Sequence, residues 1–128
     1  MSSSHNLNIA VVDDDEALCR SLGRLLRAAG MQAVTYASAE AFLADDRQPC
    51  FGCLVLDVQL GGISGLELQR RLVKAGNRTP VVFITAHDGP KIREEATAAG
   101  CSAFFRKTDS GADVLQAIRR LTVRERAN

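Results

Sequence analysis

The sequence predicts an α/β protein with a doubly wound, five-stranded parallel sheet and helices on both faces. Short apolar runs alternate five times with helix-length amphipathic segments along the 128 residues. Each run is apolar almost throughout, which is typical of strands buried on both faces. Parallel neighbours need helical crossovers, and right-handed crossovers place helices on both sides of the sheet.

The first unit begins with LNIAVV at residues 7–12, a run of mainly branched apolar residues that predicts a strand. A helix is predicted over residues 16–30, where leucines recur at helical spacing: Leu18, Leu22, Leu25 and Leu26. Gly30 supplies a stop at the C-terminal end of this helix.

The second unit is shorter and less regular. MQAVTYA at residues 31–37 predicts a weaker strand, and Ser38 can cap the short helix AEAFLAD at 39–45. Pro49 and Gly52 then mark a loop before the third unit.

The third unit starts with CLVLD at residues 53–57, an apolar strand that ends in a carboxylate. A buried carboxylate is costly unless something compensates it, so Asp57 needs a reason to be there. Ser64 and Glu67 have the spacing of a capping box for the helix GLELQRRLVKA at 65–75, and Gly76 ends that helix.

The last two units complete the alternation. VVFIT at residues 81–85 and SAFFR at 102–106 predict the fourth and fifth strands. KIREEATAA at 91–99 predicts a helix with Pro90 at its first position, and ADVLQAIRRL at 112–121 predicts the final helix.

We therefore expect one domain over residues 7–121, because the chain has the length of a common single domain and no internal linker. Residues 1–6 are polar, and we expect them to be disordered. Residues 122–128 form a short tail that cannot itself be an output domain.

Composition argues against several classes of protein function. The net charge of +1 gives no general electrostatic case for binding nucleic acid or a membrane. Apolar runs are too short for a membrane span and no secretory pattern opens the sequence, so we expect a cytoplasmic protein. Cys50 and Cys53 have CxxC spacing but lack a second ligand pair, and Cys53 is interpreted as a small buried hydrophobe.

Polar residues follow four of the five predicted strands. They are Asp13, Asp14 and Asp15 after the first strand, Asp57 at the end of the third, Thr85 at the end of the fourth, and Arg106 and Lys107 at the end of the fifth. The carboxyl ends of parallel strands share one edge of the sheet, where ligands bind in doubly wound folds. The topology therefore gathers acids, a hydroxyl and cations at one edge.

Neighbouring carboxylates repel one another, and a hard divalent cation such as Mg²⁺ removes that conflict. A lysine ammonium and a threonine hydroxyl opposite the acids suit a phosphoryl group. Such a constellation could accept a phosphoryl group onto a carboxylate.

Four motifs at these strand ends resemble the receiver domain of two-component response regulators: VVDDD, LVLDVQLGGISGLEL, VVFITA and FFRK. The resemblance covers residues 7–121. The AEAFL segment and the sequence spacing between Thr85 and Lys107 look most like the FixJ-type subfamily. The resemblance implies a flavodoxin-like (βα)5 fold and a signalling switch rather than an enzyme.

The resemblance also implies roles for individual residues. Asp57 is similar to the phosphoacceptor, which takes the phosphoryl group from a phosphohistidine. Asp14 would bind Mg²⁺ (or Mn²⁺) directly and Asp13 through water, while Asp57 and the backbone carbonyl of Gln59 would complete the protein ligands. Lys107 would pair with the phosphoryl group.

Other positions match the family's switch and its timing. Thr85 would hydrogen-bond the phosphoryl group, and the small Ala86 would leave room for it. The ring of Phe104 would turn inward as Thr85 moves. We interpret Gln59 and His87 as the residues that tune dephosphorylation.

The implied partner upstream is a sensor histidine kinase or a phosphotransfer protein. The downstream protein or output domain is unknown, and a phosphorylation-dependent homodimer is a family expectation. Direct nucleic-acid binding and membrane association are not expected of this chain.

Two positions depart from the family pattern. Thr108 replaces the usual proline after Lys107, so a trans bond or tolerated strain is expected there. Gly61 replaces the proline that is usual four residues after the acceptor Asp57, and Gly62 follows it.

Two alternatives remain open at this point. A haloacid-dehalogenase-type phosphatase would use Asp13 as nucleophile and Asp15 as acid/base. An interaction module would have the receiver fold but never accept phosphate.

Overall fold

The computed structural model describes residues 6–86 and 89–124. Its elements, in chain order, are β1 Asn8–Val12, α1 Glu16–Ala28, β2 Gln32–Tyr36, α2 Ala39–Ala44, β3 Cys53–Asp57, α3 Gly65–Lys74, β4 Val81–Thr85, α4 Pro90–Ala98, β5 Ala103–Arg106 and α5 Gly111–Arg124. All the strand pairings are parallel, in the order β2-β1-β3-β4-β5. The predicted fold class is confirmed.

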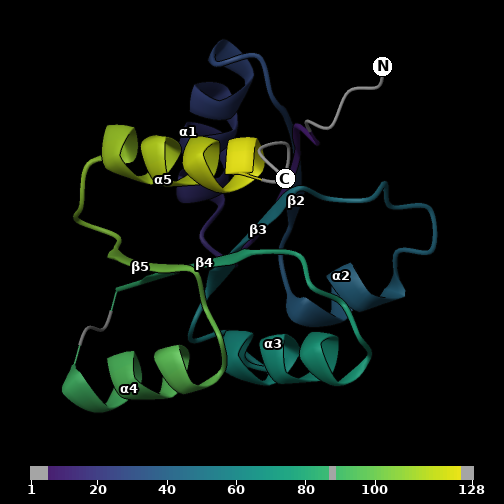
Figure 1. The fold of residues 1–128 in the computed structure, drawn as a ribbon, viewed down its shortest axis with the longest axis vertical. Helices are drawn as coiled ribbons and strands as arrows, with labels where there is room; N and C mark the ends of the chain where they lie inside the picture. The colour runs from purple at the N-terminus through teal and green to yellow at the C-terminus, as the bar shows by residue number, and fades with distance from the viewer. Residues whose placement is uncertain (1–5, 87–88, 125–128) are drawn as a thin grey trace.

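The helices cover the two faces of the sheet. Helices α1 and α5 lie together on one face, and α2, α3 and α4 lie on the other (Figure 1). The chain leaves β1 in one direction to β2 and then returns to β3 on the other side of β1. The strand order therefore reverses between β1 and β3, where a doubly wound sheet has its ligand site.

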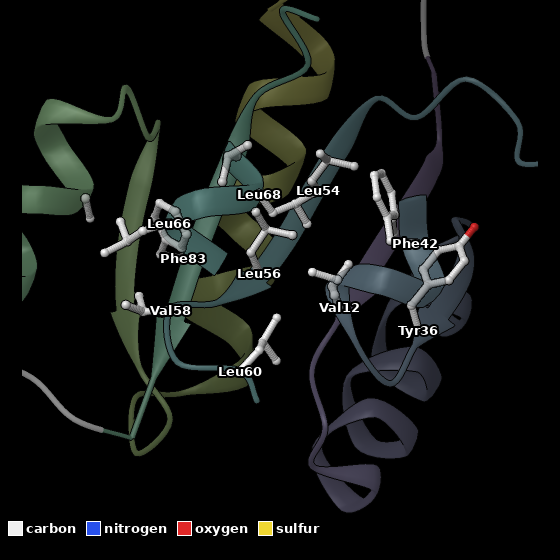
Figure 2. Close-up of a cluster of buried hydrophobic side chains, with 14 of the residues drawn as sticks. Val12, Tyr36, Phe42, Leu54, Leu56, Val58, Leu60, Leu66, Leu68 and Phe83 are labelled. Atoms are coloured by element: carbon white, nitrogen blue, oxygen red, sulfur yellow. The ribbon is translucent and has the colours of Figure 1, made fainter. Parts of the chain in front are cut away.

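Alternating strand residues build two separate apolar layers. The first layer packs the sheet against α2, α3 and α4, and Figure 2 shows Leu54, Leu56 and Phe83 pointing into it. The second layer packs the sheet against α1 and α5, and it contains Val55 and Ile84. Because the middle strands are buried on both faces, their sequences are continuously apolar.

Side chains cap α1, α2 and α3, as predicted for Ser38 and Ser64. Asp15 accepts a hydrogen bond from the Leu18 N–H at the start of α1, and Ser38 accepts one from the Ala41 N–H at the start of α2. Ser64 caps α3 by accepting from the Glu67 N–H, at 3.1 Å. The Glu67 carboxylate lies 3.1 Å from the Arg71 Nε, so among the described residues only the Ser64 half of the predicted capping box forms.

The ends of the domain differ in detail from the predicted bounds. Helix α5 continues from the predicted end at residue 121 to Arg124. Asn6, in the segment expected to be disordered, donates a hydrogen bond to the Cys50 carbonyl at 2.8 Å. The rest of that segment, and residues 125–128 of the expected tail, lie outside the described residues. Across the described residues, no helix combines the length and apolar character needed to cross a membrane.

Replacing Phe83 by alanine should make the protein easier to unfold. The Phe83 side chain is fully buried in the first layer, so its removal leaves a cavity and should lower the free energy of unfolding by about 3–5 kcal/mol. Urea titration measures this change. Val73→Ala is the control, because Val73 is 55% exposed and its loss should change little; equal effects of the two substitutions would contradict the assigned core.

Candidate functional site

The first two acids of the candidate site come from neighbouring strands. Asp57 is the last residue of β3, and Asp13 directly follows the last residue of β1. Val12 pairs with Leu56 in the parallel ladder, so Asp13 and Asp57 occupy the next rung at the carboxyl edge. The apolar residues before each acid bury the strand and thereby fix both carboxylates at the sheet's switch point.

Lys107 holds these two acids together. Its Nζ lies 3.1 Å from Asp13 Oδ1 and 3.1 Å from Asp57 Oδ2, and 3.9 Å from Asp15 Oδ2. The Lys107 side chain is only 18% exposed, so the pairing is well shielded from water. Burial alone lowers the pKa of Lys107, but its hydrogen bonds to Asp57 and Asp13 outweigh that effect and raise the pKa above its ordinary value. Lys107 is therefore a fixed cation.

Asp13 is the buried acid whose charge is least well compensated. Its Oδ1 accepts hydrogen bonds from the Asp15 N–H and from Lys107. Its Oδ2 is buried and has no hydrogen-bond partner among the described residues. Burial, together with the charge of Asp57, raises the pKa of Asp13 from 3.8 to about 6, although the bonds from Asp15 and Lys107 oppose this shift. One lysine does not fully compensate the acids.

The residues present fit a divalent cation. One carboxylate oxygen from each of Asp13, Asp14 and Asp57 can be chosen so that the three lie within 4.8 Å of one another. Asp14 is exposed, whereas Asp13 and Asp57 are buried, so the cluster opens to solvent on one side. The unpartnered Oδ2 of Asp13 is the kind of atom that a cation or its water would satisfy. Hard oxygen ligands of this kind suit Mg²⁺ or Mn²⁺.

The backbone after β3 also contributes to the site. The Gln59 N–H donates to Asp57 Oδ1 at 3.0 Å, so both oxygens of Asp57 have partners. Gln59 itself is exposed. Its main-chain N–H therefore lies beside the acids, and the role of its carbonyl as a cation ligand stays a prediction.

Thr85 ends β4 beside the lysine, and Ala86 follows the strand. The Thr85 side chain is fully buried, and its backbone carbonyl accepts a hydrogen bond from the Lys107 N–H at 2.8 Å. Ala86 is exposed. None of the peptide bonds described is cis, so the bond between Lys107 and Thr108 is trans, the first of the two expectations for that position.

Phe104 lies farther from the acids, as the second residue of β5. Its ring is half-buried at the edge of the first layer, and the Arg93 guanidinium lies over it, 4.5 Å from the ring centroid. The ring is therefore positioned where β5 meets α4. His87 lies outside the described residues, so its predicted role stays a prediction.

Two contributions to the site have no obvious signal in the sequence. The α-carbon of Gly65 lies so close to the Asp57 carbonyl that any Cβ would collide with it, so glycine is required there. Glu40 of α2 accepts a hydrogen bond from the Ile63 N–H at 2.9 Å and closes the loop in which Gly62 has φ +75°. That loop pairing joins residues far apart in sequence, so no local pattern predicts it.

The remaining sequence interpretations can also be placed. All the cysteines are free, and Cys53 is buried whereas Cys50 is exposed, so the pair forms no disulfide. Asp15 caps α1 and has one carboxylate oxygen in that bond. A phosphatase in which Asp15 acts as acid/base finds no support in that geometry.

The contribution of Asp13 to the stability of the metal-free protein should fall as pH rises from about 4 to about 6. In this window the unfolded chain has already released the Asp13 proton while the folded protein keeps it, because its pKa is about 6 instead of 3.8. The loss should not exceed about 3 kcal/mol. Urea titrations at several pH values measure it against Asp13→Asn, which should lack this component; parallel pH profiles would contradict the assignment.

Known proteins are similar to this chain in sequence and in fold. Residues 9–119 match the family model for the response regulator receiver domain. Response regulator protein TmoT of Ectopseudomonas mendocina is 40% identical over 111 residues, which are 87% of this chain and 50% of TmoT. Transcriptional regulatory protein FixJ of Azorhizobium caulinodans is 36% identical over 114 residues, which are 89% of this chain and 54% of FixJ. The chain spans about half the length of these relatives.

A solved structure agrees with these matches. The crystal structure of FixJ-N superposes with a TM-score of 0.82 at 32% identity and covers 96% of each chain. The resemblance to FixJ-type proteins that the motifs indicate is thereby confirmed. The chain belongs to the response regulator receiver domain family.

Proposed function

We propose that this domain is a phosphorylation switch in which Asp57 accepts a phosphoryl group from a sensor histidine kinase or a phosphotransfer protein. Receiver domains are signalling switches rather than classical enzymes. The observation that supports this role best is the direct pairing of Lys107 with Asp57 inside a cluster of acids. An interaction module that never accepts phosphate would have no need for two buried carboxylates that one lysine compensates only in part.

The chemistry follows from what the residues can do. An oxygen of Asp57 attacks phosphorus in line; the new O–P bond forms as the P–N bond of the phosphohistidine breaks, and the leaving imidazole keeps the bonding electron pair. Lys107, already 3.1 Å from Asp57, neutralises charge on the phosphoryl oxygens. Bound Mg²⁺ or Mn²⁺, held by Asp13, Asp14, Asp57 and the Gln59 carbonyl, would supply further charge neutralisation.

The switch would operate through the end of β4. A phosphoryl group on Asp57 offers a new hydrogen-bond acceptor to the Thr85 hydroxyl, and Ala86 is small enough to leave room for it. Movement of Thr85 would be transmitted to Phe104, whose ring contacts Arg93 of α4. Because a ligand shifts an equilibrium only through its differential affinity, these phosphoryl contacts must be stronger in the switched state.

The output and setting are proposals of the same kind. FixJ of Azorhizobium caulinodans is named a transcriptional regulatory protein, and we expect this receiver to control an output domain or partner protein of that type in the cytoplasm. The surface of α4, β5 and α5 would change on phosphorylation, and a phosphorylation-dependent homodimer would form there.

Incubation with Mg²⁺ and acetyl phosphate, followed by intact mass measurement, tests the phosphoacceptor role. The wild-type protein should gain one phosphoryl group, and Asp57→Asn should gain none, because an amide cannot act as the nucleophile. Asp46→Asn is a matched control on an exposed acid and should be phosphorylated like the wild type. The absence of an adduct on folded wild-type protein, or an adduct retained by Asp57→Asn, would overturn the proposal.

Gln59 and His87 should set how long the phosphoryl group stays on Asp57. Replacing each singly by alanine should change the half-life of the phosphorylated protein by several-fold, because each side chain would control how water reaches the phosphorus. Loss of the adduct mass with time, after removal of the phosphodonor, measures the half-life. Half-lives that match the wild type in both variants would sink this role.

A further inference from the structure

Lys107 reaches the acids from a tight turn between β5 and α5. The Asp109 N–H donates to the Arg106 carbonyl at 2.9 Å, which places Lys107 and Thr108 at the two central positions of a four-residue turn. In return, the Arg106 N–H donates to Asp109 Oδ2 at 2.8 Å. The two ends of the turn are thus joined by a reciprocal pair of hydrogen bonds.

The second of these bonds meets a specific need. β5 is the last strand of the sheet, so backbone groups that face away from β4 have no neighbouring strand to bond. The Lys107 N–H faces β4 and bonds the Thr85 carbonyl. The Arg106 N–H, one residue earlier, faces the open edge, and the carboxylate of Asp109 takes the place of the missing strand.

The ion pair in the same turn contributes less. The Nη2 atom of Arg106 lies 3.6 Å from Asp109 Oδ1, but the two side chains are 55% and 30% exposed. Exposed pairs of this kind are worth little. The bond from the Arg106 N–H to the carboxylate therefore contributes more to the turn than the ion pair does, and it supplements the backbone bond from the Asp109 N–H.

This restraint bears on the acids. The Lys107 side chain is long and rotatable, and its ammonium must stay within hydrogen-bond distance of both Asp13 and Asp57. No proline fixes the turn, because Thr108 follows Lys107 and the bond is trans. The starting direction of the lysine then depends on the hydrogen bonds at the ends of the turn.

We propose that Asp109 is a positioning residue for Lys107: by accepting the Arg106 N–H it fixes the turn and so keeps the ammonium on Asp13 and Asp57. This inference rests on the proposed role of Lys107 in phosphoryl transfer. Asp109 touches neither the acids nor the phosphoryl group and acts only through Lys107.

The test compares the rates at which acetyl phosphate, in the presence of Mg²⁺, phosphorylates a set of variants, and intact mass follows the adduct. Asp109→Ala should slow adduct formation about 10-fold, since a loosened lysine spends less time in the productive position. Asp109→Asn keeps an oxygen that can accept the Arg106 N–H and should restore most of the rate. Asp113→Ala removes an exposed acid from the first turn of α5 and should leave the rate unchanged.

A double-mutant cycle separates positioning from a general loss of structure. In a Lys107→Ala background, Asp109→Ala should slow the reaction no further, because the group that it positions is absent. An equal slowing in both backgrounds would overturn the proposal, since Asp109 would then act independently of Lys107. A rate unchanged by Asp109→Ala would overturn it as well.

Amide hydrogen exchange tests the turn without any phosphorylation. Asp109→Ala should accelerate exchange of the Lys107 amide, and Asp113→Ala should not, because only the first releases the turn. An unchanged exchange rate of the Lys107 amide would refute the positioning role of Asp109 (the clamp), even if the wild type is phosphorylated. If the wild type forms no adduct, the proposed function fails, while faster exchange in Asp109→Ala would still support the clamp.

Discussion

The shared ammonium of Lys107 is the interaction on which the site depends. It bonds both buried acids at the carboxyl edge of the sheet, and it comes from the opposite end of the chain. Without it, Asp13 and Asp57 would face each other in a buried position with little compensation. Even with it, Asp13 keeps an oxygen with no hydrogen bond among the described residues and a pKa raised to about 6. The site therefore carries an unrelieved negative charge that favours a divalent cation.

The two loops that frame this site are held by carboxylates. Glu40 of α2 accepts the Ile63 N–H in the glycine-containing loop after β3, and Asp109 accepts the Arg106 N–H in the turn after β5. These loops contain Gly61 and Thr108, the two positions that depart from the pattern that the resemblance implies. A side-chain acceptor can fix a backbone that proline would otherwise restrict. Strand ends thus position the acids, and carboxylates that bind neighbouring backbone close the two loops beside them.

Much of this arrangement could be predicted from the sequence, because strand ends follow directly from apolar runs. Topology alone predicts that Asp13, Asp57, Thr85 and Lys107 lie at one edge, and the structure brings both acids to Lys107. The collision that makes Gly65 obligatory depends on how α3 returns to β3, and a local pattern does not contain that path. Asp109 had a weak signal, since Asp in a turn often bonds nearby backbone, but its partner could not be identified without the open edge of β5.

A crystal structure of the protein with Mg²⁺ and beryllium fluoride, a mimic of the phosphoryl group, tests the central claim most directly. The account predicts the beryllium atom of the mimic bonded to an Asp57 carboxylate oxygen, the Lys107 ammonium on one of its fluorides, and Mg²⁺ on Asp14 and Asp57 with Asp13 reached through water. It also predicts the Thr85 hydroxyl on a second fluoride. A structure in which both ions are absent, with the bond between Lys107 and Asp57 still intact, would contradict it.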